Sequence, residues 1–460
     1  MKISKNENNA RPVKVGFLGF GKSNSGVFDY LLKNVPNTDF TLRCKSLPDA
    51  VPKEIGTVMS GRRELSDITE DILFLSPSAR RDIPELKEAE NRGVILTSDA
   101  EFFFQNTNAE VFALTGSDGK STTATLTSKL LSKSFGKVFP CGNIGDPLTP
   151  HLSDSGKCAY VAELSSFQLN SFKPKSIRSA ITNITKNHLN WHKSFDEYIN
   201  AKENILVNSS SRVYNFDCKI SRGFIEKYPA FAVFSTEYSE KELVSLVKAD
   251  IYITLSDGDI ILCGEKYLNL KDFTLSGLYN VKNLMCAIAL SYGYAEKDEI
   301  LPLISDFHGL PHRSEHFATY NGVKFIDSSI DSSPKRTKET LSASDGEVIV
   351  ILGGKSKGLD YNELVPTLDR KAKAVIISGE NADEIENTIK SGGFPSLYRR
   401  CIRTESLYSA AMLSCRLARA GDTVILSPAS TSFDAFRSFE ERGNFFKNTI
   451  NNIYRNNKGS

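Results

Sequence analysis

The chain alternates short apolar runs with stretches of helical periodicity. In the first hundred residues the apolar runs cover residues 13–20, 27–32, 40–42, 72–75 and 94–96. Short apolar strands separated by helices are typical of parallel sheets, whose strands are buried on both faces. This part of the chain is therefore expected to form a parallel α/β sheet.

Two later stretches repeat the alternation. From residue 111 to about residue 307, a strand, a loop and a helix are followed by apolar runs at 159–162 and 180–184, and alternating runs around Ser256-Asp257-Gly258-Asp259 predict a hairpin. Ligands of open α/β sheets bind beyond the carboxyl ends of the strands, so chemistry is expected in the loops there. After Gly309-Leu310-Pro311, further apolar runs cover residues 323–326, 348–352, 374–377 and 423–426.

The length and the charge balance of the chain narrow the class of protein to which it can belong. The 460 residues favour about three domains at ~150 residues each. Because 57 Lys and Arg nearly balance 55 Asp and Glu, no general field attracts nucleic acid or an anionic membrane, and any phosphate site must be local. No apolar run reaches the ~18 residues of a spanning helix, and the eight cysteines lack metal or disulfide spacing. We expect a cytoplasmic protein with reduced thiols and neither nucleic-acid nor membrane partner.

The first apolar strand enters a glycine-rich turn at residues 16–26. Backbone N–H groups at such a helix start favour an anion. Aligned on Gly19 and Gly21, the third glycine of a dinucleotide fingerprint is replaced by Asn24, and the next strand ends at Arg43 and Cys44 without a ribose-binding acid. A general phosphate-binding turn is favoured, and a nicotinamide oxidoreductase stays as an alternative that NAD binding would reveal.

The strongest local signal is a strand at 111–114 that runs into a glycine loop and a helix. The loop amides can cradle phosphates, Lys120 can neutralise the β and γ phosphates, and the Ser121 hydroxyl can bind Mg²⁺. Leu114 replaces the first glycine of the complete motif, so a turn without nucleotide is the alternative. The candidate ATP-binding residues of this loop are Thr115, Gly116, Ser117, Asp118, Gly119, Lys120, Ser121 and Thr122.

Two charged residues further along could serve a metal. Glu163 ends an apolar strand and could complete the Mg²⁺ shell of Ser121, or simply be a solvated acid. Lys202 shares an apolar helix face with Ile199 and Leu206. Either its ammonium snorkels to water, or the buried amine loses its proton and is modified, for example to a carbamate that binds metal.

Three smaller patterns complete the candidates. Ser194 and Glu197 form a capping box that starts the helix of Lys202. His188 and His192 are four residues apart, but no third residue follows at a spacing suited to zinc, so a zinc site is not expected. Asn280 and Asn283 share a face at the start of a helix, where they could read an adenine edge or cap the helix.

Taken in order, the segments TGSDGKST, GNIG, AELSSFQL, NHLNWH, YINAKENI, LSGLYNVKN, GLPHRSEH and LSPASTSFDAFRSFEERG resemble the Mur ligases over essentially the whole chain. Within that family the similarity is greatest to the branch that joins D-glutamate to UDP-N-acetylmuramoyl-L-alanine. The resemblance implies an α/β protein of three domains, namely a Rossmann-like UDP-substrate domain at 1–108, a phosphate-loop ATPase domain at 109–310 and a Rossmann-like amino-acid domain at 311–460.

The resemblance also implies an ATP- and Mg²⁺-dependent ligase of peptidoglycan synthesis that works through an acyl phosphate. We expect a monomer whose small-molecule partners are UDP-N-acetylmuramoyl-L-alanine and D-glutamate. By resemblance, Lys120, Glu163, His188 and Lys202 are catalytic, and Ser121, Glu163, His188 and carbamylated Lys202 hold metal. The remaining implied contacts are Asn280, Asn283, Arg313 and Asp327 for the nucleotide, Lys357, Ser432 and Phe439 for D-glutamate, and Ser23, Asn24, Ser76, Asn143, Ser165 and Gln168 for the UDP-sugar peptide.

The chain also departs from the family pattern. Ser329 and Asp331 replace the usual lysine and threonine near the amino-acid pocket, and an acid there would repel a dicarboxylate. Asp118 stands where the family usually has asparagine, and Tyr279 where it usually has histidine. Asn187 and Asn190 stand where aspartates are common, and the Ser76-Pro77-Ser78 turn has serine where glycine is usual. Two alternatives therefore stay open, namely a ligase of the same superfamily with another amino acid or a folate-like acceptor, and a nucleotide-binding homologue without turnover.

Overall fold

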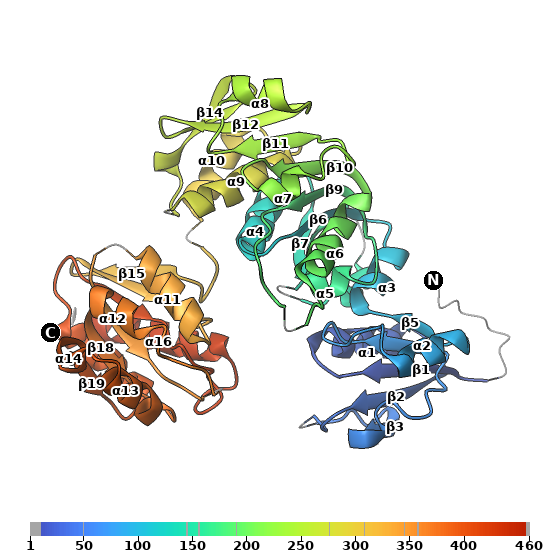
Figure 1. The fold of residues 1–460 in the computed structure, drawn as a ribbon, viewed down its shortest axis with the longest axis horizontal. Coiled ribbons are helices and arrows are strands. Elements are labelled where there is room, and N and C mark those ends of the chain that lie inside the picture. The colour runs from blue at the N-terminus through green and yellow to red at the C-terminus, as the bar shows by residue number, and fades with distance from the viewer. Residues whose placement is uncertain are drawn as a thin grey trace. The chain divides into compact units, whose positions relative to one another are not determined.

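The computed structural model describes residues 11–48, 50–143, 146–154, 157–189, 191–275, 277–307, 309–344, 346–356 and 358–456. In this part of the chain three β-sheets are each flanked by helices (Figure 1). The chain divides into two compact units, residues 1–306 and 307–460. The first unit contains two of the sheets and the second unit contains the third.

The first sheet has the strand order β3-β2-β1-β4-β5 and is parallel throughout. Its central strands β1 and β4 are apolar because helices and loops bury both faces, and the ring of Phe17 stacks on those of Phe40 and Phe74. The parallel sheet expected from the apolar runs is thus confirmed, although the run at 27–32 belongs to α1 and not to a strand. Its elements are β1 Val13–Leu18, α1 Lys22–Asn34, β2 Thr38–Cys44, β3 Ile55–Ser60, β4 Ile72–Leu75, α2 Pro84–Asn91, β5 Ile95–Thr97 and α3 Asp99–Asn106.

The second sheet has the order β14-β13-β12-β11-β10-β9-β6-β8-β7. Strands β6 to β12 pair with one another in parallel, and β12 to β14 form an antiparallel meander that confirms the predicted hairpin. Its elements are β6 Glu110–Thr115, α4 Lys120–Leu131, β7 Lys137–Gly142, β8 Cys158–Glu163, α5 Ser166–Leu169, β9 Lys175–Ile181, α6 Phe195–Val207, β10 Asn208–Asn215, α7 Lys219–Arg222, β11 Ala232–Ser235, α8 Glu240–Leu246, β12 Ile251–Ser256, β13 Asp259–Leu262, β14 Glu265–Asn269, α9 Leu278–Ser291 and α10 Lys297–Ser305.

Helices cover both faces of the second sheet. Successive side chains of a strand point to opposite faces. On one face of β6, Val111 packs in a core with Ile205 of α6. On the other face, the ring of Phe112 contacts those of Phe135 and Tyr294, which follow α4 and α9. The loop between β6 and α4 therefore opens at the carboxyl edge of the sheet, between two packed layers.

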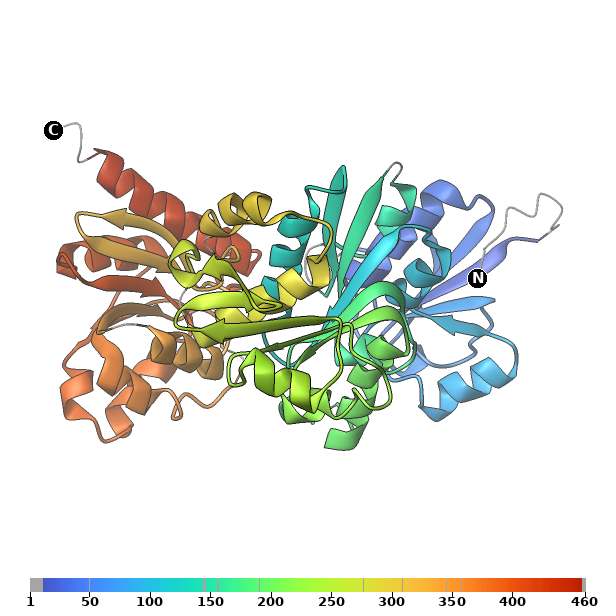
Figure 2. The ribbon, with the colours of Figure 1, turned by 90° about the horizontal axis from the view of Figure 1, so that it is seen from above.

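The third sheet has the order β15-β16-β20-β17-β18-β19, with only the β15 and β16 pair antiparallel among the described strands. Helix α16, the red helix in Figure 2, packs Phe446 and Ile450 against Val323 and Phe325. The elements are β15 Glu315–Tyr320, β16 Val323–Asp327, α11 Pro334–Ala343, β17 Val348–Leu352, α12 Val365–Lys371, β18 Ala372–Ile377, α13 Ala382–Ser391, α14 Pro395–Tyr398, β19 Cys401–Arg403, α15 Leu407–Leu417, β20 Thr423–Leu426 and α16 Phe439–Asn456.

The domain boundaries at 108 and 310 stay a prediction. The first lies between α3 and β6, where the chain passes from the first sheet to the second. The second lies close to the division between residues 306 and 307 that separates the two compact units. Among the described residues, no helix is both long and apolar enough to cross a membrane.

Candidate active site

The loop between β6 and α4 is held open by the segment that follows β9. The Ser117 amide donates to the Asn183 carbonyl at 2.9 Å, and the Asp118 amide donates to the Asn183 side-chain oxygen at the same distance. The Thr182 hydroxyl donates to the Asp118 carbonyl at 2.6 Å. These bonds fix the backbone of residues 117 and 118, so the loop is preorganised by its neighbour strand.

Two glycines let neighbouring side chains approach this loop. Gly119 has a φ of 77°, and a Cβ there would lie 2.1 Å from the Asn283 side-chain oxygen. A Cβ at Gly116 would lie 1.8 Å from the Thr182 hydroxyl. Any larger residue would displace these contacts, which explains the spacing of the two glycines.

Three polar residues begin α4 next to the loop. The Lys120 ammonium donates to the carbonyls of Gly116 and Ser117, both at 3.0 Å. Ser121 and Thr122 are buried in the first turn of the helix. The ammonium therefore lies against the loop where phosphates are expected, and the two hydroxyl residues follow Lys120 in the first turn of the helix.

Lys202 is buried against the same loop. Its side chain is 1% exposed, and its ammonium nitrogen donates to the Gly116 carbonyl at 2.7 Å and to the Thr115 hydroxyl at 3.3 Å. The Tyr198 ring lies 4.7 Å from that nitrogen. Burial, reinforced by the nearby Lys120 charge, holds the pKa of Lys202 well below its usual value. Snorkelling to water is therefore wrong for this residue, while carbamylation stays a prediction.

Glu163 ends β8 with one carboxylate oxygen engaged and one unengaged. The side chain is 1% exposed, and Oε1 accepts from the Asn143 amide at 2.9 Å. Within the described part of the chain, the buried Oε2 has no hydrogen-bond partner. The solvated strand-end acid is therefore wrong, because this carboxylate is enclosed.

The unengaged oxygen provides a test of whether a metal ion fits here. A buried carboxylate oxygen without a donor is costly unless a cation or donor meets it. Mg²⁺ prefers hard oxygen ligands of this kind, with a hydroxyl and waters completing the shell. Glu163, with the Ser121 hydroxyl as the second expected protein ligand, therefore has chemistry that fits a divalent cation.

His188 lies in a tight turn beside this site. Its φ is 55°, and its carbonyl accepts from the amides of Trp191 and His192 at 3.1 and 3.0 Å. Its ring lies 6.4 Å from that of Tyr198, whose hydroxyl is 2.8 Å from the Ser117 hydroxyl. The structure thus brings His188 to the periphery of the phosphate loop, while its metal-binding role stays a prediction.

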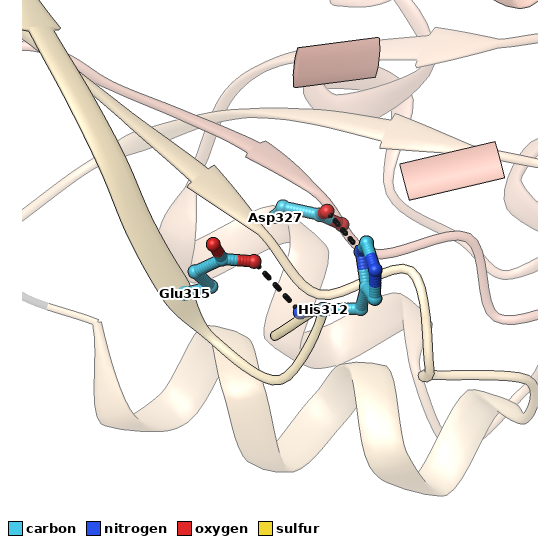
Figure 3. A group of neighbouring side chains, drawn as sticks. All are labelled: His312, Glu315 and Asp327. Atoms are coloured by element: carbon cyan, nitrogen blue, oxygen red, sulfur yellow. Dashed lines mark hydrogen bonds and ion pairs between the residues drawn. The ribbon is translucent and has the colours of Figure 1, made fainter. Parts of the chain in front are cut away.

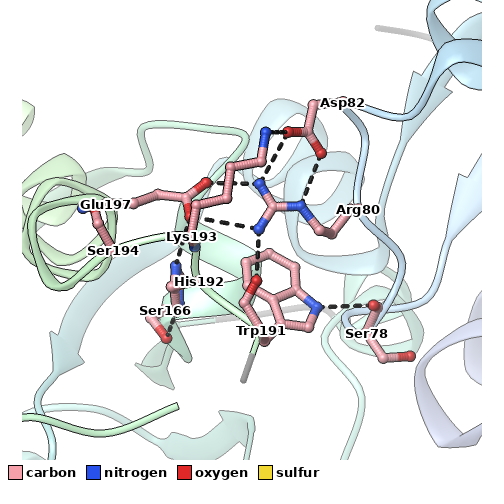
Figure 4. A network of polar contacts seen from close by, with 9 residues as sticks. All are labelled: Ser78, Arg80, Asp82, Ser166, Trp191, His192, Lys193, Ser194 and Glu197. Atoms are coloured by element: carbon pink, nitrogen blue, oxygen red, sulfur yellow. Dashed lines mark hydrogen bonds and ion pairs between the residues drawn. The ribbon is translucent and has the colours of Figure 1, made fainter. Parts of the chain in front are cut away.

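The helix that carries Lys202 begins as expected but is capped differently. The Ser194 hydroxyl accepts from the Glu197 amide at 3.1 Å. The Glu197 carboxylate does not complete the expected capping box, because it binds the Arg80 guanidinium and the Lys193 amide (Figure 4). Helix α6 is therefore tied at its start to a loop of the first sheet.

Asn280 and Asn283 lie together at the start of α9. Both are buried, and the Asn283 amide donates to the Asn280 side-chain oxygen at 3.4 Å. The Thr123 hydroxyl on α4 donates to the Asn283 oxygen at 3.3 Å. Helix α9 thus presents these amides beside the phosphate loop, in keeping with their expected nucleotide role.

The candidate residues of the first sheet lie around the glycine turn. The buried Asn24 amide donates to the Gly19 carbonyl at 2.8 Å and to the carbonyls of Leu18 and Phe74. Ser23 is half-buried in the same helical turn. The Ser76 hydroxyl is 3.3 Å from that of Ser78 and faces Gly19. Ser23, Asn24 and Ser76 therefore meet at one edge, with Asn24 bracing the turn.

Two further candidates pair with one another at the end of β8. The Ser165 hydroxyl and amide both donate to the Gln168 side-chain oxygen at 2.9 Å. The Ser165 oxygen in turn accepts from the Gln168 amide, which completes a capping box for α5. With Asn143 on Glu163, these residues surround the carboxyl end of β8.

In the second unit, Asp327 at the end of β16 is fixed on both carboxylate oxygens. The His312 ring nitrogen Nδ1 is 2.7 Å from Oδ2, and the Ser329 amide donates to Oδ1 at 2.9 Å. Glu315 accepts from the His312 amide and pairs with Lys447 at 2.9 Å (Figure 3). The side chains of His312, Glu315 and Asp327 could bind a metal ion. Glu315, however, already pairs with Lys447 and holds the backbone of His312 in place. Arg313 is half-buried next to His312.

Ser432 and Phe439, two of the residues expected to bind the amino acid, lie near the buried Arg442 of α16. Its guanidinium donates to the Ser329 hydroxyl and carbonyl and to the carbonyls of Ser430 and Thr431, at 2.8 to 3.0 Å. Burial lowers its pKa to about 10. Ser432 is buried beside it, and the Phe439 carbonyl accepts from the Ser329 hydroxyl. Lys357 and Asn190 lie outside the described residues.

Asp331 does not project an unpaired carboxylate. Its Oδ2 accepts from the hydroxyls of Thr340 and Ser427 at 2.7 and 2.8 Å, and the residue is 4% exposed. These hydroxyl donors stabilise the negative charge of the buried carboxylate. The repulsion expected between Asp331 and a dicarboxylate is therefore moderated by its own hydrogen bonds.

Sequence reasoning missed four residues that organise these sites. Tyr198 lies four residues before Lys202 and therefore on the same face of the helix, so the spacing could have pointed to it. Asn183 falls within the predicted strand at 180–184, whereas in the structure it follows β9, and its carbonyl and side chain brace the loop between β6 and α4. Arg80 and Arg442 gave no local signal, because the contacts with Trp191 and Ser329 that make them important span 111 and 113 residues.

Residues 114–291 match the Mur ligase middle domain, and residues 312–430 match the glutamate ligase domain of the same family. A UDP-N-acetylmuramoylalanine--D-glutamate ligase of Ruminiclostridium cellulolyticum is 36% identical over 98% of this chain and 99% of its own. A protein of that name from Acetivibrio thermocellus is 38% identical over 83% of each chain.

Solved structures are similar in fold. UDP-N-acetylmuramate-alanine ligase MurC from Thermotoga maritima has a TM-score of 0.57 at 17% identity, covering 96% of this chain and 99% of that one. MurF from Acinetobacter baumannii has a TM-score of 0.54 at 16% identity, covering 95% and 93%. At these identities the likeness concerns the fold alone.

Proposed function

The chain belongs to the Mur ligase family, and we propose that it joins D-glutamate to UDP-N-acetylmuramoyl-L-alanine in an ATP-dependent reaction of peptidoglycan precursor synthesis. The observation that carries the proposal is the 36% identity to a ligase of this name along 98% of the chain. The use of ATP is supported by the phosphate loop, where the side chains of Lys120 and Lys202 both donate to the Gly116 carbonyl.

The reaction joins two species that do not combine unaided. A carboxylate is a poor electrophile, so the alanyl carboxylate first takes the γ-phosphoryl group of ATP and releases ADP. The amine of D-glutamate then attacks the carbonyl carbon of the acyl phosphate. The new C–N bond forms, the C–O bond to phosphate breaks, and the amine loses a proton.

The phosphate loop supplies the positions for the first step. We assign Thr115 to Thr122 to the triphosphate, because Lys120 and the backbone amides in the first turn of α4 present positive charge at the end of the loop. Asn280 and Asn283 are assigned to the adenine. From the second unit, Arg313 and Asp327 are assigned to the nucleotide, with Asp327 held by His312.

A divalent cation would be held by Ser121 and Glu163, and a second one by His188 and carbamylated Lys202. When bound, Mg²⁺ neutralises the charge that develops on the transferred phosphoryl group. Glu163 would present Oε2, while Asn143 keeps the other oxygen in place. Burial lowers the pKa of Lys202, which favours the neutral amine, the form that reacts with carbon dioxide.

The remaining candidates would bind the two substrates that are joined. We assign Ser23, Asn24, Ser76, Asn143, Ser165 and Gln168 to the UDP-sugar side, where the internal bonds of Asn24 and Gln168 shape the walls. Lys357, Ser432 and Phe439 are assigned to D-glutamate, with Arg442 holding the segment at 430–432. We propose that the chain works as a monomer in the cytoplasm, which sedimentation and fractionation would test.

Amino-acid-dependent phosphate release tests the function. Purified protein is incubated with ATP, Mg²⁺ and UDP-N-acetylmuramoyl-L-alanine, and each of a panel of amino acids is added in turn. Release that requires D-glutamate supports the proposal, whereas no release with D-glutamate overturns it. Release with a different amino acid would identify another ligase of the superfamily, as Ser329 and Asp331 suggest. ATP binding without release under any acceptor would identify a homologue without turnover.

A further inference from the structure

Arg80 joins the two sheets of the first unit. It lies in the loop between β4 and α2, and its guanidinium is fixed by a bidentate pair with Asp82 at 2.8 and 2.9 Å. From there it donates to the Trp191 carbonyl at 2.6 Å and to the Glu197 carboxylate at 2.7 Å (Figure 4). One side chain of the first sheet thus holds two points of the second.

Trp191 is held from two directions by that loop. Besides its carbonyl bond to Arg80, its indole N–H donates to the Ser78 carbonyl at 2.9 Å. The guanidinium carbon of Arg80 also lies 4.8 Å from the centroid of the indole ring. Trp191 therefore has little freedom to move unless the segment at 78–80 moves with it.

Trp191 also holds the backbone turn that begins at His188. The Trp191 amide donates to the His188 carbonyl at 3.1 Å, and both rings contact Phe167, at 4.6 Å for Trp191 and 5.0 Å for His188. His188 has a φ of 55°, a backbone conformation that a non-glycine residue keeps only when its surroundings hold it. A shift of Trp191 would therefore shift His188.

The second contact of Arg80 reaches the helix of Lys202. Glu197 lies in the first turn of α6, and its hydrogen bond from Arg80 lowers the pKa of its carboxyl group, so it stays ionised. Lys202 follows five residues later on the same rigid element and touches the phosphate loop. Arg80 thus bears on both residues assigned to the second metal.

The opposite end of this network lies at the expected UDP-sugar edge. Ser78, which accepts from Trp191, has its hydroxyl 3.3 Å from that of Ser76. Ser76 is packed against Gly19 of the glycine turn. A ligand that rearranged the turn at 76–78 would therefore act directly on Trp191.

We propose that Arg80 is a positioning residue that couples occupancy of the UDP-sugar edge of the first sheet to the placement of His188 and Lys202. The proposal rests on the proposed function, since it names the acceptor whose binding is sensed. Arg80 does not touch the reacting atoms. It acts by holding Trp191 and Glu197, so that the metal-binding side chains are in register when the acceptor is bound.

The chain contains its own reporter, because Trp191 is its single tryptophan. Trp191 emission is followed while UDP-N-acetylmuramoyl-L-alanine is added to wild type, Arg80→Met, Arg80→Lys and the control Arg81→Met. Arg81 is adjacent but pairs with Glu90 and Glu101, outside the network. We expect a saturable emission change in wild type and Arg81→Met, a reduced change in Arg80→Lys and none in Arg80→Met, with acceptor binding verified by calorimetry.

Kinetics provide the second readout. We expect Arg80→Met to lower kcat by about 10-fold to 100-fold through misplacement of His188 and Lys202, while KM for ATP stays as in Arg81→Met. If Arg80→Met unfolds, Arg80→Lys decides the outcome. An unchanged wild-type emission at saturating acceptor overturns the proposal, as do an emission response and a kcat in the Arg80 variants equal to those of Arg81→Met. Absence of phosphate release in wild type would instead contradict the proposed function, because the emission test needs binding alone.

Discussion

The ammonium nitrogen of Lys202 lies 2.7 Å from the carbonyl oxygen of Gly116, so a buried amine joins helix α6 to the phosphate loop. We expect Lys202→Ala to lower kcat for D-glutamate-dependent phosphate release by about 100-fold, because it removes a charged or metal-binding group from the site. ATP binding, measured by calorimetry, should persist. The matched control is Lys227→Ala, since Lys227 is exposed and pairs with Glu203. Full activity of Lys202→Ala would contradict the assignment.

Carbamylation of Lys202 should depend on pH in a definite direction. Only the neutral amine reacts with carbon dioxide, and burial holds the Lys202 pKa well below its usual value, which raises the share of neutral amine at any given pH. As the pH falls the amine is protonated and the carbamate should be lost. Carbon-13 NMR with labelled bicarbonate should show one carbamate signal that is absent from Lys202→Ala and weakens in acid. A signal of equal intensity in both proteins would place the modification elsewhere.

Glu163→Gln tests the buried oxygen at the end of β8. Removing the charge should lower kcat by about 100-fold or more and weaken Mn²⁺ binding, measured by electron paramagnetic resonance with ATP present. Asn143→Ala, which removes only the bond to Oε1, should weaken metal binding by about 10-fold to 100-fold. The prediction fails if Glu163→Gln binds Mn²⁺ as wild type does.

Arg442 should matter for stability as well as for the amino-acid pocket. Its guanidinium satisfies the carbonyls of Ser329, Ser430 and Thr431 inside the second unit. Arg442→Met leaves these acceptors buried without a donor, so the free energy of unfolding should fall by about 3 kcal/mol or more in urea titrations. Arg442→Lys should restore part of this loss, and KM for D-glutamate should rise more than KM for ATP. Equal stability of Arg442→Met and wild type would contradict the bonding pattern.

His192 gives the protein an acid-sensitive element. Burial lowers its pKa from 6.5 to about 4, while its Nε2 lies 2.9 Å from the Ser166 hydroxyl. Between these two values the unfolded chain binds more protons than the folded one, so this group makes the folded state less stable as the pH falls from 6.5 to about 4. His192→Gln should flatten the pH dependence of the urea midpoint over that range. A midpoint profile identical to that of wild type would show that His192 does not titrate in this way.

Much of the fold could be read from local patterns. Strands β4, β17 and β20 are almost continuously apolar because the sheet buries them on both faces, β1 is apolar apart from Lys14, and all four were expected. Strand β3 was missed because it lies at the sheet edge and is half exposed, and β10 because its sequence begins Asn-Ser-Ser-Ser. A polar strand has no periodic signal, although its backbone pairs as well as any other.

The sequence by itself determined the three α/β segments, the phosphate loop and the family, because periodicity and motif spacing are properties of neighbouring residues. The tertiary structure decided which polar groups meet. Lys202 reaches Gly116 across 86 residues, Arg80 reaches Trp191 across 111, and no donor among the described residues meets the buried Oε2 of Glu163. No local pattern encodes such pairs, since they depend on how sheets and helices bring distant residues together and on the cost of burying a charge without a partner.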